Sequence, residues 1–375
     1  MLRCTGQPRP EWQKTVESQG MHYHSLDGVP YWDERVFYRF TAAEIDTLEA
    51  ATYALDAMCL DAVQHVIDHA LFDRFLVAAP YRELIRLSWE HDEHTIYGRF
   101  DLAFDGNSPP KLLEYNADTP TALLEAAVIQ WFWLKDCFPE QQQFNSIHER
   151  LLEMFQTLRG EISERFYFAA LAGCIEDFMT VNYLRDVAIQ AGFETAYLDV
   201  EQIGWHAQRR VFTDLDEAPI RCCFKLYPWE WMQTYAFGPN LLQAACRWFE
   251  PPWKALLSNK AILPILWELN PRSPYLLETA REPLPGGDYV KKPILGREGA
   301  NVQIFEHGKL LTETDGPYDG PAVYQETCPL PRFDEKYFPI VGSWIVNGWS
   351  CGLGIREDES PITGNLSRFV PHVFE

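Results

Sequence analysis

A turn sequence between two short apolar and aromatic runs constrains the fold more than any other feature of this chain. The turn is DGNSP at residues 105–109, and it separates residues 96–104 from residues 111–116. Gly, Asn and Asp tolerate the backbone conformations of tight turns, and Pro interrupts a strand. The pattern therefore predicts an antiparallel β-hairpin.

Polar side chains recur at every second position of both predicted strands. Successive side chains of a strand point to opposite faces, so Arg99 and Asp101 share one face, and Glu114 and Asn116 share a face of the partner strand. If the two faces coincide, two carboxylates and an amide oxygen offer hard ligands suited to Mg²⁺, and the arginine can hold a phosphate oxygen. The alternative is a solvated strand face with ordinary cross-strand ion pairs, and spacing alone favours neither.

The rest of the chain predicts a mixed α/β protein. Apolar residues at helical spacing indicate amphipathic helices, and short apolar runs indicate buried strands. Residues 165–201 predict a βαβ unit, with Gly192 at the end of its helix. Because no repeat or long linker interrupts the chain, we expect one unit over residues 1–375. The other helices are expected in residues 41–79, 123–134 and 148–164, and the other strands in residues 290–293, 302–305, 322–325 and 342–346.

A second candidate site is the sequence YVKKPILGREGANVQI at residues 289–304. Two predicted strands enclose a loop with Gly296 and Gly299, and Lys291 and Lys292 precede it. Glycines let backbone N–H groups approach an anion closely, and a lysine supplies positive charge for ATP phosphates. The loop matches neither the Walker A nor the GxGxxG pattern. An exposed hairpin loop is the alternative.

Two further cations are ambiguous on their own. Lys260 lies just before the helical pattern in residues 261–269, and a lysine in a helix's first turn opposes the helix dipole unless an anion lies nearby. Such a position favours nucleotide contact, although surface lysines there are common. Arg356 follows a second predicted hairpin.

The charge of the chain limits its partners. With 54 acidic and 32 basic residues, the formal net charge is −22. A field of this sign repels nucleic acids and anionic membrane surfaces, and it attracts cations such as amines. We therefore expect small-molecule substrates, no nucleic-acid partner and no membrane partner.

The cysteine pattern and the N-terminal sequence indicate a cytoplasmic protein. The nine cysteines include no CxxC pair and fall in predicted core segments such as residues 169–174. Reduced, buried thiols are typical of the cytosol. Residues 1–14 lack the apolar stretch of a signal peptide, and no run of about 18 uncharged apolar residues follows.

Several stretches of the chain carry a family resemblance. They are KLLEYNADTPTALLE at residues 111–125, VKKPI at residues 290–294 and GIREDESPITGNLSRFVPH at residues 354–372, together with Lys260. With these stretches the chain resembles the glutathionylspermidine synthetase family, whose members have an ATP-grasp fold and join an acid to an amine. The resemblance runs in the same order over residues 33–374.

The resemblance implies a metal and phosphate centre on the predicted hairpin. Asp101, Glu114 and Asn116 would hold two Mg²⁺ ions. Arg99 would contact the transferring phosphate, and Arg356 would reach the γ-phosphate of ATP from a closing loop, so these two arginines are the expected catalytic residues.

The resemblance also implies an ATP-binding lid and hinge in residues 258–326. Lysines would contact the ATP phosphates, the Gly-rich loop would form a mobile lid, and a later strand would lie at the adenine hinge. The residues are Lys260 and Lys292 for the phosphates, Gly296 and Gly299 for the lid, and Tyr324, Gln325 and Glu326 for the hinge.

Substrate residues follow from the same resemblance. Thr119 and Thr121 stand where the family places small hydroxyl residues near the acid, and the carboxylates of Glu176 and Asp177 fit a site for the amine. Thr121 replaces an expected serine, and residues 185–221 match poorly, so the resemblance does not name the two substrates. A peptide or glutathione-like acid and a polyamine-like amine are the expected classes. The family's bifunctional members carry a separate amidase domain, and we expect no amidase activity here.

Two other functions compete with an acid–amine ligase. One is a non-catalytic, regulatory protein that keeps the ATP-binding fold. The other is a kinase that phosphorylates a small acid and has no amine site. Retention of every predicted metal and phosphate group argues against the first, and trapping of an acyl phosphate with hydroxylamine would identify the second.

Overall fold

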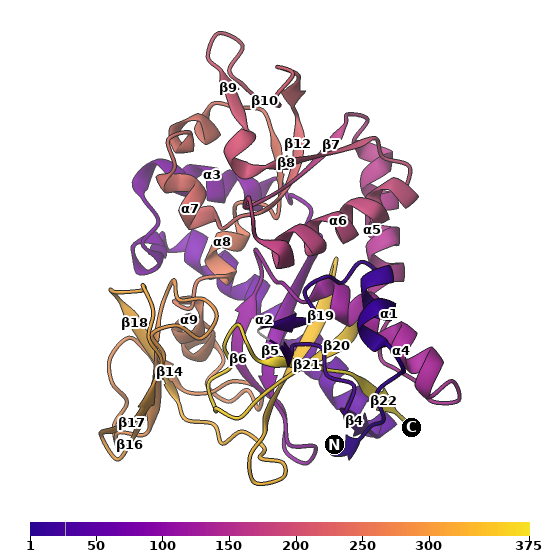
Figure 1. Cartoon of the computed structure of the whole chain (residues 1–375). Coiled ribbons are helices and arrows are strands. Elements are labelled where there is room, and N and C mark those ends of the chain that lie inside the picture. Colours follow the sequence, from indigo (N-terminus) through magenta and orange to yellow (C-terminus); the bar gives the residue numbers. More distant parts are fainter. Residues whose placement is uncertain (27) are drawn as a thin grey trace.

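The computed structural model describes residues 1–26 and 28–375. Its centre is a five-stranded antiparallel sheet that contains the predicted hairpin (Figure 1). In spatial order its strands are β21 (Arg368–Val370), β20 (Trp349–Asp358), β19 (Phe338–Val346), β5 (Tyr97–Ala103) and β6 (Lys111–Asn116).

Local sequence explains the two hairpins of this sheet. In the β5–β6 turn, the Asp105 carboxylate accepts hydrogen bonds from the backbone N–H groups of Asn107 (2.8 Å) and Ser108 (2.7 Å). The β19–β20 turn is Asn347-Gly348, and both residues have positive φ, as a two-residue hairpin turn of type I′ requires. Both hairpins confirm the sequence prediction.

A second sheet of four parallel strands contains the βαβ unit. Its spatial order is β13 (Arg247–Phe249), β12 (Cys222–Leu226), β7 (Phe166–Ala170) and β8 (Thr195–Asp199). Helix α6 (Ile175–Gln190) connects β7 to β8, and α5 (Ile147–Glu161) packs beside α6. Gly192 follows α6 with a φ of +93°, which confirms its predicted place at the helix end.

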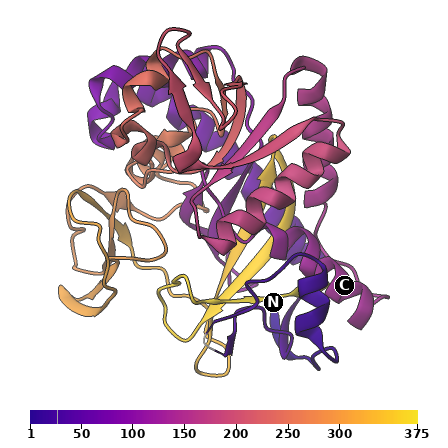
Figure 2. The ribbon, with the colours of Figure 1, turned by 45° about the horizontal axis from the view of Figure 1, so that its top comes forward.

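The third large sheet carries the Gly-rich loop. It is antiparallel, with the order β14 (Thr279–Ala280), β18 (Ala322–Glu326), β15 (Tyr289–Pro293), β16 (Gln303–Glu306) and β17 (Lys309–Glu313). The loop joins β15 to β16. The sequence patterns predicted β15, β16 and β18 and missed β17, whose side chains are mostly exposed. Figures 1 and 2 show this sheet and the parallel sheet at separate corners around the central sheet.

The N-terminal and C-terminal segments meet in one small sheet. The strand β4 (Val36–Phe40) lies between β1 (Leu2–Thr5) and β22 (His372–Phe374), which explains why the two termini lie close together in Figure 1. The remaining strands form a three-stranded sheet and a two-stranded one. They are β9 (Gly204–His206), β10 (Val211–Thr213) and β11 (Pro219–Ile220), and β2 (Ser25–Leu26) and β3 (Val29–Pro30).

The long helix α2 (Ala42–Asp68) covers one face of the central sheet. It begins with a capping box in which Thr41 and Glu44 satisfy each other's backbone N–H groups. Its apolar face packs with Phe100 and Leu102 of β5 in one core cluster. Residues at alternate positions of β5 therefore point to the other face, where the polar side chains predicted for the site lie.

The other helices surround these sheets. The predicted helical region in residues 123–134 forms a short π-helix, η2 (Glu125–Ile129), which continues into α4 (Gln130–Cys137). The remaining helices are α1 (Trp12–Ser18), α3 (Ala79–Glu90), α7 (Trp229–Thr234), α8 (Lys254–Leu257) and α9 (Ile262–Leu269), with the 3₁₀ helices η1 (Leu71–Phe75), η3 (Val200–Gln202) and η4 (Gly238–Leu242).

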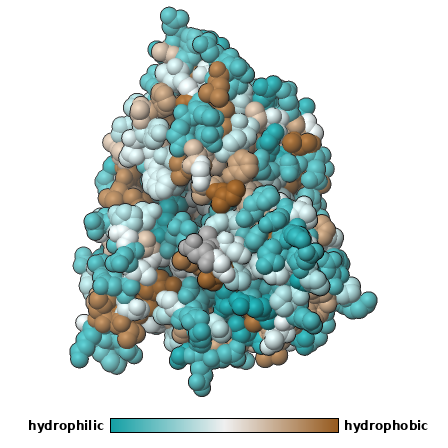
Figure 3. Space-filling view, in the orientation of Figure 1, coloured by the Kyte–Doolittle hydropathy of each residue, from teal (hydrophilic) through white to brown (hydrophobic). Residues whose placement is uncertain are grey.

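The surface, the cysteines and the lengths of the helices add three observations. On the face shown in Figure 3, hydrophilic residues predominate and apolar residues form small separate groups. None of the nine cysteines is in a disulfide. Within residues 1–26 and 28–375, the structure contains no helix long and apolar enough to span a membrane.

Candidate active site

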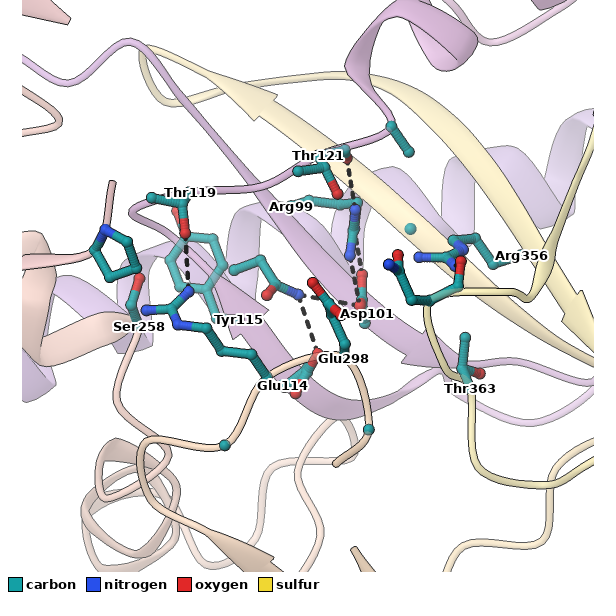
Figure 4. Close-up of a pocket in the computed structure, with 18 of the residues that line it drawn as sticks. Arg99, Asp101, Glu114, Tyr115, Thr119, Thr121, Ser258, Glu298, Arg356 and Thr363 are labelled. Atoms are coloured by element: carbon teal, nitrogen blue, oxygen red, sulfur yellow. Dashed lines mark hydrogen bonds and ion pairs between the residues drawn. The ribbon is translucent and has the colours of Figure 1, made fainter. Parts of the chain in front are cut away.

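A cavity of about 270 Å³ lies where the three large sheets meet. Strands β5 and β6 form its floor, the start of α6 borders one end, and the loop between β15 and β16 covers it (Figure 4). Most of the residues predicted from the sequence line this cavity: Arg99, Asp101, Glu114, Asn116, Thr119, Thr121, Glu176, Asp177, Lys260, Gly296, Gly299 and Arg356.

The register of β5 and β6 brings the four hairpin residues together. Arg99 lies opposite Asn116, and Asp101 lies opposite Glu114, so their side chains share the cavity face. Arg99 forms a two-point ion pair with Asp101, with distances of 2.6 Å from Nε to Oδ1 and 2.9 Å from Nη2 to Oδ2. The predicted convergence of these side chains is therefore confirmed, although their chemical roles stay predictions.

The Asn116 amide bridges the two carboxylates. Its Nδ2 donates to Asp101 Oδ2 at 3.0 Å and to Glu114 Oε1 at 3.2 Å. Rotation of this amide by half a turn would present Oδ1 beside the same two carboxylates. The donor set is then two carboxylates and one amide oxygen, which fits Mg²⁺ and leaves further positions for water and phosphate oxygens.

Two lysines stand behind Glu114. The Nζ of Lys260 lies 2.9 Å from Glu114 Oε2 and also donates to the Gly296 carbonyl at 2.7 Å. Burial alone would raise the pKa of Glu114, but the charges of Lys260 and Lys292 outweigh burial and lower its pKa to about 2. Glu114 is therefore ionised at neutral pH, as a metal ligand must be.

Lys292 and the predicted hinge lie beside the cavity. Lys292 is buried, and its Nζ donates to the Leu113 carbonyl (3.0 Å) and to Gln325 Oε1 (2.6 Å). Burial and the nearby Lys260 lower the pKa of Lys292 to about 8, although Glu114 opposes this shift. The Gln325 side chain therefore bonds within the protein: its Oε1 accepts from Lys292, and its Nε2 donates to the Leu112 carbonyl at 3.1 Å.

The other hinge residues flank Gln325 on β18. The Tyr324 ring packs edge-on against Tyr289, with 5.3 Å between the ring centroids. The backbone N–H of Glu326 donates to the Glu278 carbonyl at 2.7 Å. The adenine contact of this segment stays a prediction.

A glycine makes room for Arg99. A Cβ at Gly342 on the neighbouring strand β19 would lie 2.8 Å from Arg99 Cδ, closer than side chains tolerate. The Arg99 side chain therefore crosses Gly342, and its Nη1 donates to the Thr121 carbonyl at 2.8 Å. The sequence patterns did not identify Gly342, because only the pairing of β5 with β19 reveals this close approach.

The Gly-rich loop is folded over the cavity. Gly299 has a φ of +69°, and a Cβ there would overlap the Thr363 carbonyl oxygen, so only glycine suits this position. The guanidinium of Arg297 donates to Thr119 Oγ1 at 2.9 Å and pairs with Glu230 of α7. Arg297 is a cavity residue that we did not predict, although it lies within the GREG sequence that marked the loop.

Arg356 lies within strand β20 and reaches the cavity from there, whereas we expected it after the hairpin in a closing loop. Its Nη2 donates to three backbone carbonyls of the following loop, those of Gly364 (2.7 Å), Asn365 (3.2 Å) and Ser367 (3.2 Å). The same loop meets Gly299 through Thr363. Arg356 therefore connects the central sheet with the segment that supports the Gly-rich loop.

The far end of the cavity is acidic. Glu176 and Asp177 stand in the first turn of α6, and Glu298 points from the Gly-rich loop into the cavity (Figure 4). Burial and the neighbouring Glu176 raise the pKa of Asp177 to about 6. Burial and Glu176 likewise raise the pKa of Glu298, a second cavity residue that the sequence patterns missed.

Two further details of the sequence prediction were wrong. Helix α9 begins at Ile262, so Lys260 precedes the helix instead of lying in its first turn. The Asn259 side chain accepts a hydrogen bond from the Ala261 N–H (2.9 Å) and shapes this turn. Cys174 is a wall residue of the cavity at the start of α6, where we expected a core cysteine, because its strand ends at Ala170.

Comparison with solved structures identifies the fold. The mixed α/β architecture with several sheets is of the ATP-grasp type. A glutathione synthetase-like effector from Globodera pallida (GSS30) has a similar fold, with a TM-score of 0.61 at 10% identity, covering 97% of this chain and 96% of the effector.

The family follows from the sequence. Residues 3–375 match the family described as glutathionylspermidine synthase preATP-grasp, and the chain belongs to this family. The predicted resemblance and the ATP-grasp fold are confirmed.

Three relatives show the range of this family. A Haemophilus influenzae protein named "Putative acid–amine ligase" is 42% identical over the full length of both chains. The bifunctional glutathionylspermidine synthetase/amidase of Escherichia coli is 29% identical over 99% of this chain and 64% of its own length. Trypanothione synthetase of Crithidia fasciculata is 30% identical over 76% of this chain and 48% of its own length. The chain thus spans about two thirds or less of the length of the Escherichia coli and Crithidia fasciculata relatives. Membership of this family supports a ligase.

Proposed function

We propose that the protein is an ATP- and Mg²⁺-dependent ligase that joins a carboxylic acid to an amine. One observation carries the proposal: Asp101, Glu114 and Asn116 converge on one face of a hairpin, beside Arg99 and Lys260 and beneath a Gly-rich loop. Anionic metal ligands and cationic side chains in one covered cavity suit the transfer of a phosphoryl group, which depends on positioning and on neutralising negative charge.

Each group has a proposed role in binding ATP. Asp101, Glu114 and Asn116 would hold two Mg²⁺ ions, which supply neutralisation of the phosphate charge when they are bound. Lys260 and Lys292 would contact phosphates, and residues 258–326 would form the ATP-binding region with the adenine at residues 324–326. Arg99 and Arg356 would stabilise charge on the transferring phosphoryl group.

The proposed reaction has two steps. A carboxylate oxygen of the acid attacks the γ-phosphorus of ATP, and the bond to the β-phosphate oxygen breaks to release ADP and leave an acyl phosphate. The amine nitrogen then attacks the acyl carbon, phosphate leaves with the electron pair of the C–O bond, and the nitrogen loses a proton. Water would hydrolyse the acyl phosphate, so a loop that covers the cavity has a clear purpose.

The two ends of the cavity favour different substrates. Thr119, Thr121 and the partly buried guanidinium of Arg297 offer hydrogen-bond donors to a carboxylate, and Arg297 Nε has no partner among the described residues. We place a peptide or glutathione-like acid there. Glu176 and Asp177 suit an ammonium group, so we place a polyamine-like amine at the acidic end.

The direct test is ADP release by the purified protein with Mg²⁺ and ATP. A panel of peptides and small acids is assayed, each with and without polyamines and amino acids. ADP that appears only with a particular acid and amine, together with an amide product, supports the ligase. Accumulation of an acyl phosphate, with no amide formed from any amine, indicates a kinase, and tight ATP binding without turnover on any pair contradicts the proposal.

A further inference from the structure

The metal end of the cavity contains Asp101, Glu114 and Asn116, and the acidic end contains Glu176, Asp177 and Glu298. The two ends differ in how their carboxylates are paired with cations. Asp101 is paired with Arg99, and Glu114 is paired with Lys260. In residues 1–26 and 28–375, no Lys, Arg or His forms an ion pair with Glu176, Asp177 or Glu298. Three carboxylates therefore face a shared space without a bonded counter-charge.

Glu176 gives independent reason to expect a ligand. It is only 9% exposed, lines the cavity, and has no hydrogen-bond partner for its side chain in the described part of the chain. Its carboxylate lines the cavity, where a ligand with hydrogen-bond donors can reach it. A bound ammonium group would supply both the missing donors and the missing positive charge.

The loop holds Glu298 at this end of the cavity. Glu298 has a φ of +52°, a conformation that non-glycine residues seldom adopt, and it is fixed on both sides. Arg297 before it is anchored to Thr119 and Glu230, and Gly299 after it packs against the Thr363 carbonyl. Glu298 is an exposed residue that lines the cavity. It can therefore meet a substrate group that extends beyond Glu176.

The charge on the amine limits what Glu298 can contact. The nitrogen that attacks an acyl phosphate must be unprotonated, so it cannot neutralise these carboxylates at that moment. A second amino group on the same substrate remains an ammonium ion at neutral pH. It can stay bound to carboxylates while the first nitrogen reacts.

We propose that Glu298 binds the non-reacting ammonium group of the amine substrate and thereby couples amine binding to closure of the Gly-rich loop. The contact joins the loop to α6 through the substrate, because Glu176 and Asp177 lie on α6 and Glu298 lies on the loop. Glu298 is then a specificity-determining residue for an amine with at least two amino groups. This inference rests on the proposed acid–amine ligase function.

The test compares 1,3-diaminopropane with n-propylamine, which has the same carbon chain and one amino group. Calorimetry measures the binding of each amine in the presence of Mg²⁺ and a non-hydrolysable ATP analogue. We expect Glu298→Gln to weaken binding of the diamine about tenfold or more, as loss of a charge-assisted hydrogen bond does, and to leave n-propylamine binding unchanged. Glu298→Asp should retain part of the affinity, and Glu140→Gln, an exposed residue in a turn after α4, is the control.

Amide hydrogen exchange of residues 294–303 gives a second readout that requires no turnover. The diamine should slow exchange of this loop in the wild-type protein and in Glu140→Gln, and should leave exchange unchanged in Glu298→Gln. Equal diamine affinity in Glu298→Gln and the wild type, absence of amine binding to the wild type, or a diamine-induced slowing of loop exchange in Glu298→Gln equal to that in the wild type would each overturn the inference.

The ligase proposal and this inference fail separately. If diamine binding depends on Glu298 but no acid gives ADP, the ligase proposal is contradicted and the contact between Glu298 and the ammonium group is retained. ADP formation with a diamine at equal KM in the wild type and Glu298→Gln would retain the ligase and overturn the role of Glu298.

Discussion

The two ends of the cavity are both rich in carboxylates, yet their charges are arranged in opposite ways. At the metal end, Arg99 and Lys260 pair with Asp101 and Glu114 within the protein. At the acidic end, Glu176 and Asp177 lie side by side at the start of α6 and have no ion-pair partner among the described residues. The first end is electrostatically balanced by direct ion pairs before a ligand binds, whereas at the second end the charges of Arg297 and Arg356 act on the carboxylates without direct ion pairs. Removal of a carboxylate should therefore have opposite consequences at the two ends.

The largest effect is expected at the metal end. Glu114→Gln should lower kcat for ADP release at least about 100-fold, because it removes a charged metal ligand and leaves the Lys260 and Lys292 charges uncompensated. Steady-state ADP assays over a range of Mg²⁺ concentrations measure the loss, and Glu140→Gln should match the wild type. Equal kcat in Glu114→Gln and the wild type would contradict the metal assignment.

Removal of the charge of a buried carboxylate near the acidic end, Glu125, should stabilise the folded protein at neutral pH. Glu125 is 1% exposed, and burial together with Glu176 raises its pKa from 4.5 to about 7. Between these pH values the folded protein retains a proton that the unfolded chain releases, so stability falls as pH rises from about 4.5 to 7. Glu125→Gln removes this penalty.

The expected gain from Glu125→Gln is about 3 kcal/mol at pH 8, and it should vanish near pH 4.5. Urea unfolding at several pH values measures it, with Glu140→Gln as the control that shows no such trend. A constant difference across this pH range would show that Glu125 does not titrate as proposed.

The metal end also depends on the space that Gly342 leaves for the Arg99 side chain. Gly342→Ala would place a Cβ 2.8 Å from Arg99 Cδ and displace the guanidinium from Asp101. We expect a roughly tenfold to 100-fold lower kcat, as misplacement of a positioning group produces. Gly160→Ala in α5 is the matched control, because nothing lies within 4 Å of its added methyl group. Comparable kcat values for the two variants would show that Arg99 tolerates displacement.

The sequence predicted more of the residues at the metal end than at the acidic end, for a physical reason. Strand alternation and the 105–109 turn depend on neighbouring residues, so they determine which side chains of the β5–β6 hairpin share a face. Glu298 and Gly342 become functional candidates only through contacts between distant segments. The burial of Glu125 likewise depends on a π-helix that packs against other elements, and apolar periodicity cannot predict such packing.

The smallest expected effect is a stabilisation caused by loss of Glu176. Glu176→Gln removes one of two adjacent carboxylates and keeps the shape of the side chain, so repulsion of Asp177 falls. We expect the Tm of the ligand-free protein to rise by about 1–3 °C. Spermidine should raise the Tm of the wild type more than that of the variant, because a ligand that binds only the folded state stabilises it more when it binds more tightly. A lower Tm in ligand-free Glu176→Gln, with Glu140→Gln unchanged, would mean that Glu176 has a stabilising partner in the folded protein and that the acidic end is balanced without an amine.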